Sequence, residues 1–344
     1  MITTNTTFTQ TFGFNHNEAE ILCAAKGIAP EQTAASLKTL QTWYGGYRFA
    51  AGAQAVLHPA LTLDCLDKLS LGTPATPEPI WPQQMVSGTA AVNVHTLTAA
   101  LSNGINIENH KDKDNDDSRT KTIFYNLINT GKTTSYSQLL NGTQSNNYHD
   151  NLVKLLAYLG LATWQETSLL HDVFVLPNQA VRSAYYQYYL QQAEELYGVG
   201  YDRLALAKAI EALGMKNDIE PFLDQAQQVI TQLAKKSNSI KDKQSLKTLL
   251  LALLYQFPVY FIDSEYTEAE HIPDIVLRYR SPFALQHQHL IELKYCPKSD
   301  GGETWEAGVA QTKRYLQQPE IAHLAELSAW LLLTDGGQLV AQHI

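Results

Sequence analysis

The sequence is poor in cysteine and has no long apolar run. Only three cysteines, Cys23, Cys65 and Cys296, occur among the 344 residues, and their spacing matches no CxxC or CxxH motif. We therefore expect neither a disulfide framework nor a zinc site. The longest apolar runs, residues 249–254 and 330–333, are far too short to span a bilayer, so no membrane partner is expected.

Charge is also sparse, at 17% of residues, and it is unbalanced. The 25 Lys and Arg residues against 34 Asp and Glu residues give a formal net charge of -9. This balance argues against a protein that coats nucleic acid by bulk electrostatics, so any phosphate contact must be local. The first residues, MITTNTTFTQTFGF, lack the basic and apolar segments of a secretion signal. We expect a cytoplasmic bacterial protein, with secretion as an effector left open.

The abundance of apolar residues, 44% of the chain, excludes intrinsic disorder, and the length favours two domains. Apolar residues recur at three- and four-residue spacing before about residue 236, which predicts an all-α domain over residues 1–236. We divide this domain into 1–122, with a proline-rich connector over 72–82 and a polar loop over 103–120, and 123–236.

The periodicity changes in residues 237–344, where short β-type runs follow an apolar helix. The pattern predicts the order α-β-β-β-α-β, an α/β layer arrangement, and hence a protein that is α+β overall. The expected elements are a helix over 245–256, strands over 259–262, 275–279 and 289–295, a helix over 304–316 and a strand over 329–333.

Two of these strands carry charged residues at a spacing that suits metal chemistry. Side chains at positions i and i+2 of a strand share a face, so Glu292 and Lys294 should point together, away from Ile291 and Leu293. If Asp274 begins the neighbouring strand on the same side, two carboxylates and an ammonium group converge. Hard divalent cations such as Mg²⁺ or Mn²⁺ prefer such oxygen ligands.

Pro273-Asp274 on one strand and Glu292-Leu293-Lys294 on the next resemble the motif of the PD-(D/E)XK nuclease superfamily. The resemblance implies a restriction-endonuclease-like fold of the α-β-β-β-α-β type. It also implies that Asp274 and Glu292 hold a metal ion and that Lys294 orients the attacking water or polarises the phosphate. Supporting roles fall on Glu265, as an extra metal ligand, and on Gln311 and Tyr315 in the following helix.

The helical part has a resemblance of its own. The segments WYGGYRF at 43–49, LLAYLGL at 155–161 and LPN at 176–178 are similar to the helical region that follows the ATPase module in bacterial AAA-ATPase-like proteins. Those proteins end in a PD-(D/E)XK domain. Two departures stand out: Gly45 replaces the usual acid of WYDGYRF, and the ATPase module is absent from this sequence.

These observations leave two hypotheses. The first is a nuclease dependent on Mg²⁺ or Mn²⁺ that hydrolyses phosphodiester bonds, with DNA favoured over RNA and with Asp274, Glu292 and Lys294 as its catalytic core. The second is a catalytically weak or inactive protein of the same fold, an effector or inhibitor that binds a protein partner through its helical domain. Many relatives carry a Glu on the first helix, where this sequence offers only Asp242 or Gln244, and this difference favours the second hypothesis.

Overall fold

The structure, a computed structural model, divides into two compact units, Met1–Tyr185 and Tyr186–Ile344. The unit boundary falls within helix α8 (Gln179–Tyr197). Each unit is described by itself. The described residues are 13–50, 52–71, 123, 126–136, 148–235, 240–264, 272–280, 283–296, 305–335 and 337–344.

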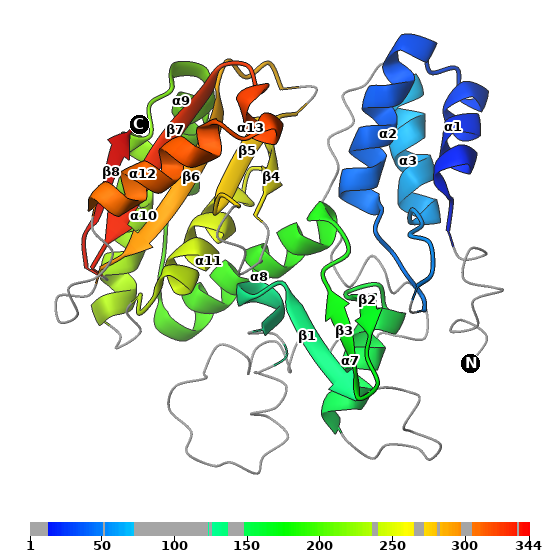
Figure 1. The fold of residues 1–344 in the computed structure, drawn as a ribbon, viewed down its shortest axis with the longest axis horizontal. Helices are drawn as coiled ribbons and strands as arrows, with labels where there is room; N and C mark the ends of the chain where they lie inside the picture. The colour runs from blue at the N-terminus through cyan, green and yellow to red at the C-terminus, as the bar shows by residue number, and fades with distance from the viewer. Residues whose placement is uncertain are drawn as a thin grey trace. The chain divides into compact units, whose positions relative to one another are not determined.

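The first unit opens with three packed helices (Figure 1). The Asn15 side chain accepts a hydrogen bond from the backbone N–H of Glu18, whose carboxylate in turn accepts one from the Asn15 N–H, so a capping box starts the first helix. Pro30 and Pro59 stand in the first turns of the next two helices, where a missing N–H costs nothing. The three helices are α1 (His16–Ala25), α2 (Pro30–Tyr44) and α3 (Pro59–Ser70).

A three-stranded antiparallel sheet in the first unit corrects the prediction of an all-α domain over residues 1–236. Its strands, in the order β1-β3-β2, are β1 (Lys132–Tyr136), β2 (Thr163–Thr167) and β3 (His171–Val175). Helix α7 (Tyr148–Tyr158) packs against β1. Each strand is only five residues long, too short for alternation to stand out, and β1 finds its partner far along the chain. The overall α+β class is confirmed.

Two of the sequence segments singled out above meet in the first unit. The Asn178 side chain donates a hydrogen bond to the carbonyl of Gly45 over 2.9 Å and accepts one from the N–H of Val181 at the start of α8. Gly46 has a φ of +84°, and a Cβ there would lie 2.1 Å from the carbonyl oxygen of Pro177. The WYGGYRF and LPN segments therefore form one close backbone junction.

The second unit is built around a five-stranded sheet in the order β4-β5-β6-β7-β8. Strands β4, β5 and β6 form an antiparallel meander, β6 and β7 are parallel, and β8 returns antiparallel to β7. The parallel pair is connected through α12 and α13, as a crossover connection requires. The strands are β4 (Tyr260–Asp263), β5 (Ile275–Tyr279), β6 (Gln288–Tyr295), β7 (Leu327–Thr334) and β8 (Leu339–His343). The helices, besides α8, are α9 (Arg203–Lys216), α10 (Glu220–Lys235), α11 (Lys243–Leu254), α12 (Trp305–Leu316) and α13 (Pro319–Ala322).

Helices cover both faces of this sheet (Figure 1). Tyr315 of α12 and Ile321 of α13 pack with Val276 and Leu290 on one face. Successive strand residues point to opposite faces, so His289 points the other way, where its ring bonds the carbonyl of Leu213 in α9 over 3.1 Å. Every residue of β6 from Gln288 to Lys294 is consequently buried.

The division into units falls earlier than the domain boundary expected at 236/237, because α9 and α10 pack with the sheet. Gln227 of α10 donates a hydrogen bond to the carbonyl of Gly337 and accepts one from the N–H of Leu339, both over 2.7 Å. The predicted connector over 72–82 and loop over 103–120 lie outside the described residues. Within the part of the chain that is described, no helix has both the length and the apolar character needed to cross a bilayer.

Candidate functional site

The candidate site lies where β5 begins and β6 approaches its end. Ile275 pairs with Ile291 in the antiparallel register, and continuing that register by one residue sets Asp274 opposite Glu292. Residues directly opposite each other in an antiparallel pair point to the same face, so the two carboxylates come together. The backbone N–H of Leu293 donates a hydrogen bond of 2.8 Å to Oδ2 of Asp274 and fixes that carboxylate against β6. The expected juxtaposition of Asp274 and Glu292 is thus present.

The charged residues of β6 are buried, whereas the ordinary outcome for a polar residue in an alternating strand is exposure. Glu292 is 0% exposed and Lys294 is 2% exposed. Helix α12 closes over them because Gly308 has no side chain: a Cβ there would lie 2.9 Å from two carbons of Leu331 and 3.3 Å from Cγ of Lys294. Charged side chains are this deeply buried only when they are paired. Glu292 and Lys294 therefore belong to a buried polar site in which opposite charges face each other.

Lys243 is a site residue that the sequence interpretation missed. Its ammonium group lies 2.8 Å from Oδ2 of Asp274 and 3.4 Å from Oε1 of Glu292, so it bridges the two carboxylates. Lys294 approaches Oε1 of Glu292 from 3.5 Å. Two carboxylates and two ammonium groups therefore share the site.

The start of α11 explains why Lys243 reaches the site and Asp242 serves another purpose. The Asp242 carboxylate caps the helix by accepting a hydrogen bond of 2.7 Å from the N–H of Ser245. Lys243 is the first helical residue, where a cation opposes the helix dipole. The sequence alone gave no signal for this role, because a lysine in a first helical turn is usually solvated, and the two carboxylates offset its unfavourable interaction with the helix dipole here.

Helix α12 positions Lys294 through a short chain of hydrogen bonds. The Lys294 ammonium donates to Oε1 of Gln311 over 2.6 Å, and the Gln311 amide donates to the hydroxyl of Tyr315 over 2.5 Å. Gln311 and Tyr315 lie one turn apart on the same helix face. The structure thus brings together both residues to which the resemblance gave supporting roles, while Glu265 lies outside the described residues.

Burial and neighbouring charges shift the pKa values of Glu292, Lys243 and Tyr315. Burial and the neighbouring Asp274 carboxylate raise the pKa of Glu292 to about 7, although Lys243 and Lys294 act in the opposite direction. Burial acts to lower the pKa of Lys243, but the attraction of Asp274 and Glu292 together outweighs burial and raises it. Burial, together with the nearby carboxylates, raises the pKa of Tyr315 against the effect of its bond with Gln311.

The donor set fits a divalent cation through its two carboxylates. Oε2 of Glu292 is buried and has no hydrogen-bond partner, so an unused anionic oxygen stands inside the site. Among the described residues, no group of three or more His, Cys, Asp or Glu side chains is arranged to hold a metal ion. Within that part of the chain, a metal ion here would have only Asp274 and Glu292 as side-chain ligands, with water completing its shell as Mg²⁺ usually requires.

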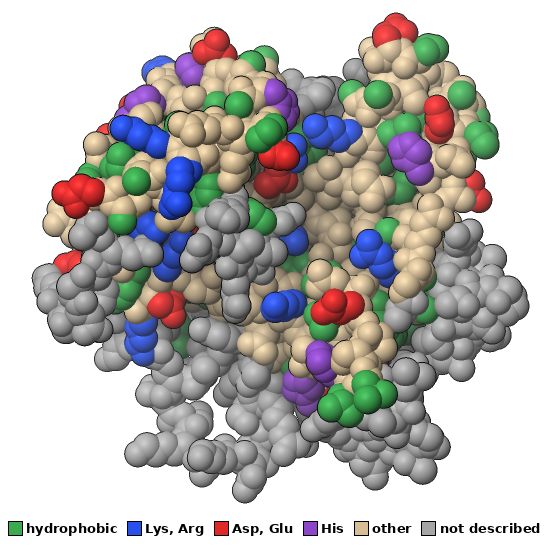
Figure 2. Space-filling view, viewed as in Figure 1, with side chains coloured by type: hydrophobic (Ala, Val, Ile, Leu, Met, Phe, Trp, Pro, Cys, Tyr) green, Lys and Arg blue, Asp and Glu red, His purple; other side chains and the backbone are tan. Residues whose placement is uncertain are grey.

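Exposed basic residues lie on the same helix as Gln311. Lys313 and Arg314 occupy the last turn of α12 and are exposed. Several basic side chains are visible on the face of the second unit that α12 covers, with acidic ones interspersed (Figure 2). On this face the positive charge is interspersed with negative charge and does not form an extended patch.

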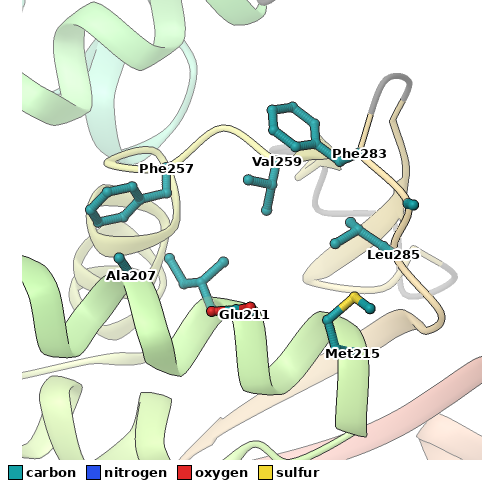
Figure 3. Close-up of a pocket in the computed structure, with 9 residues that line it drawn as sticks. Ala207, Glu211, Met215, Phe257, Val259, Phe283 and Leu285 are labelled. Atoms are coloured by element: carbon teal, nitrogen blue, oxygen red, sulfur yellow. The ribbon is translucent and has the colours of Figure 1, made fainter.

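A separate apolar hollow of about 410 Å³ lies between α9 and the segments before β4 and β6 (Figure 3). Phe257, Val259, Phe283 and Leu285 line it, and the Glu211 carboxylate stands at its edge. None of the site residues described above is among its lining residues. The charged site and this hollow are therefore distinct features of the second unit.

Comparison of the chain with protein-family models, with curated proteins and with solved structures gives no match in any of the three.

Proposed function

We propose that the protein is a metal-dependent nuclease that hydrolyses phosphodiester bonds, with DNA as its favoured substrate. One observation carries this proposal: Asp274, Glu292 and Lys294, from two adjacent strands, meet in one buried polar site. The order of α11, β4, β5, β6, α12 and β7 supports it, because the restriction-endonuclease-like fold has that order of elements. Mg²⁺ or Mn²⁺ held by the two carboxylates would neutralise charge that develops on the scissile phosphate.

The remaining tasks fall on the chain's own groups. The ammonium of Lys294, held in place by Gln311, would donate hydrogen bonds to a phosphate oxygen and stabilise its growing charge. Asp274 is kept in its position by the backbone N–H of Leu293. Lys313 and Arg314 are exposed and suited to neighbouring phosphates of the same strand.

Cleavage assays with an Asp274→Asn variant test this proposal. Plasmid and single-stranded DNA, with RNA alongside, are incubated with Mg²⁺ or Mn²⁺ and with wild-type or variant protein. We expect wild-type cleavage and a loss of about a hundredfold or more in the variant, because one of the two carboxylates loses its charge. Asp224→Asn, which changes an exposed residue of α10 in the same way, should cleave as the wild type does. Equal cleavage by wild type and Asp274→Asn would exclude this site as the source of activity.

A second candidate function is a catalytically inactive protein of the same fold that binds a protein partner. The bridging of Asp274 and Glu292 by Lys243 favours it, since a protein cation already balances the carboxylates. Leu169 and Leu170, between β2 and β3, are 74% and 59% exposed and offer an apolar contact in the first unit. Absence of cleavage with either metal and all three substrates would favour this candidate.

A further inference from the structure

The Lys243 ammonium stands at the point where two buried or nearly buried carboxylates face each other. Its distances of 2.8 Å to Asp274 and 3.4 Å to Glu292 are those of ion pairs to both. The two carboxylates approach from β5 and β6, while the lysine enters from the first turn of α11. A cation in this position has the same electrostatic task as a metal ion held by the same oxygens.

With both carboxylates ionised, the charges of the site balance without a metal ion. Asp274 and Glu292 are matched by Lys243 and Lys294, the latter itself 3.5 Å from Glu292. A divalent cation joining all four groups would leave an excess of positive charge in a site that excludes most water. Movement of one ammonium group out of the site would restore the balance, and the two lysines differ in their freedom to move.

Lys243 is the more mobile of the two. Its side chain is 39% exposed, whereas that of Lys294 is 3% exposed and bonded to Gln311. The four-carbon stem of a lysine at a helix start can swing its ammonium group into solvent with no change in the backbone. Lys294 has no comparable route because α12 covers it at Gly308.

We propose that Lys243 is a built-in competitor for the divalent cation: its ammonium occupies the cation position between Asp274 and Glu292, and a metal ion binds only by displacing it. This inference rests on the proposed function in taking the carboxylate pair as the metal site. It adds a control element, because the lysine sets the metal concentration at which the site fills and keeps the carboxylate pair neutralised below that concentration.

Titration of Mn²⁺ without nucleic acid tests the competition. Calorimetry, together with the electron paramagnetic resonance signal of free Mn²⁺, gives the affinity of the full-length wild type and of Lys243→Gln. We expect the glutamine variant to bind Mn²⁺ at least about tenfold more tightly, because a unit positive charge is removed within 4 Å of both ligands. Lys243→Arg keeps the charge and should bind weakly. Lys235→Gln removes an exposed charge at the end of α10 and should match the wild type.

A labelling experiment on the wild type needs no substitution. Acetylation by a lysine-specific reagent, read by mass spectrometry, should increase severalfold at Lys243 when Mn²⁺ is added and remain unchanged at Lys235.

A double variant shows where the gained affinity arises. Lys243→Gln combined with Asp274→Asn should lose the higher Mn²⁺ affinity of Lys243→Gln, which would place the gain at this site.

The two proposals fail in different ways. Equal Mn²⁺ affinity in wild type and Lys243→Gln, including no binding by either, overturns the competition, as does Mn²⁺ binding without a change in Lys243 labelling. A gain in affinity without cleavage of either DNA substrate or of RNA leaves the competition standing and overturns the nuclease proposal. Cleavage by the wild type, together with unchanged Mn²⁺ affinity in Lys243→Gln, supports the nuclease proposal and overturns the competition.

Discussion

At the residue scale, the candidate site shows how charged side chains are kept inside a protein. Glu292 and Lys294 are almost fully buried, and each has an opposite charge or a hydrogen-bond partner within 3.5 Å. Removing one partner from such a group leaves the other unpaired, which costs more than the pair contributed. Oε2 of Glu292 is the exception, because it is buried without a hydrogen-bond partner.

His289 gives a prediction at the same scale. It is 0% exposed, edge-on to Tyr260, and its ring bonds the carbonyl of Leu213. Burial, aided by His287 and His343, lowers its pKa from 6.5 to about 3. His289 therefore binds a proton more readily in the unfolded chain than in the folded protein. Its contribution to the free energy of unfolding is fully present above pH 6.5 and is lost as the pH falls towards 3.

We expect His289→Gln to lack this component of acid sensitivity, which amounts to a few kcal/mol. Urea unfolding of wild type and variant at pH 7 and pH 4 measures it: the wild type should lose more of its unfolding free energy over that interval. A His289→Gln protein with the same loss as the wild type would contradict the assignment.

At the scale of elements, close approaches between backbones fix how the pieces meet. Gly308 lets α12 come down on β6 and β7, and Gly46 lets the turn after α2 touch Pro177. In both cases the absence of a Cβ atom allows two segments of the chain to lie closer together than any other residue would permit. The first of these contacts positions Gln311 beside Lys294.

The junction at Gly46 can be tested against a matched glycine. Gly46 and Gly52 both have positive φ, at +84° and +70°, but a Cβ on Gly52 would meet nothing within 4 Å. Gly52→Ala should therefore cost only the backbone strain, about 1 kcal/mol. Gly46→Ala adds a clash with the carbonyl of Pro177 and should cost about 2 kcal/mol more. Thermal or urea unfolding compares them, and equal losses would show that the junction yields to the added methyl group.

At the scale of the whole molecule, the helices before residue 236 divide between the units. Tyr186 of α8 stacks on Tyr255, with ring centroids 5.1 Å apart, and Gln187 bonds the carbonyl of Tyr255 over 3.3 Å. These interactions tie α8 to the end of α11, while the contacts of Leu213 and Gln227 tie α9 and α10 to the sheet. A domain that began at residue 237 would lack all of these contacts, because their other partners lie before residue 236.

Two fragments distinguish the boundaries. Residues 179–344 keep α8 whole and retain the helices that cover the sheet, so this fragment should unfold cooperatively and show dispersed amide signals by NMR. Residues 237–344 lack α9 and α10, so the apolar surface that these helices cover is exposed, and this fragment should aggregate or fail to fold. Cooperative unfolding of the shorter fragment would restore the boundary expected from the sequence.

The sequence by itself predicted the order of elements from α11 to β7 and the shared face of Glu292 and Lys294. Alternation located β5 and β6, and the spacing of Glu292 and Lys294 put both on one face, because strand periodicity is a local property. Their catalytic and metal-binding roles stay predictions. The helical pattern before α11 was read correctly for α9 and α10, but β1, β2 and β3 were missed since five-residue strands carry too little periodicity.

Only the tertiary structure decided how distant residues combine. It brought Lys243 between Asp274 and Glu292, buried both faces of β6, added β8 beyond β7 and assigned α9 and α10 to the sheet. These features depend on which elements pack together, and packing is governed by surfaces assembled from many parts of the chain. A lysine at the start of a helix looks like a solvated charge until the fold sets two carboxylates in front of it.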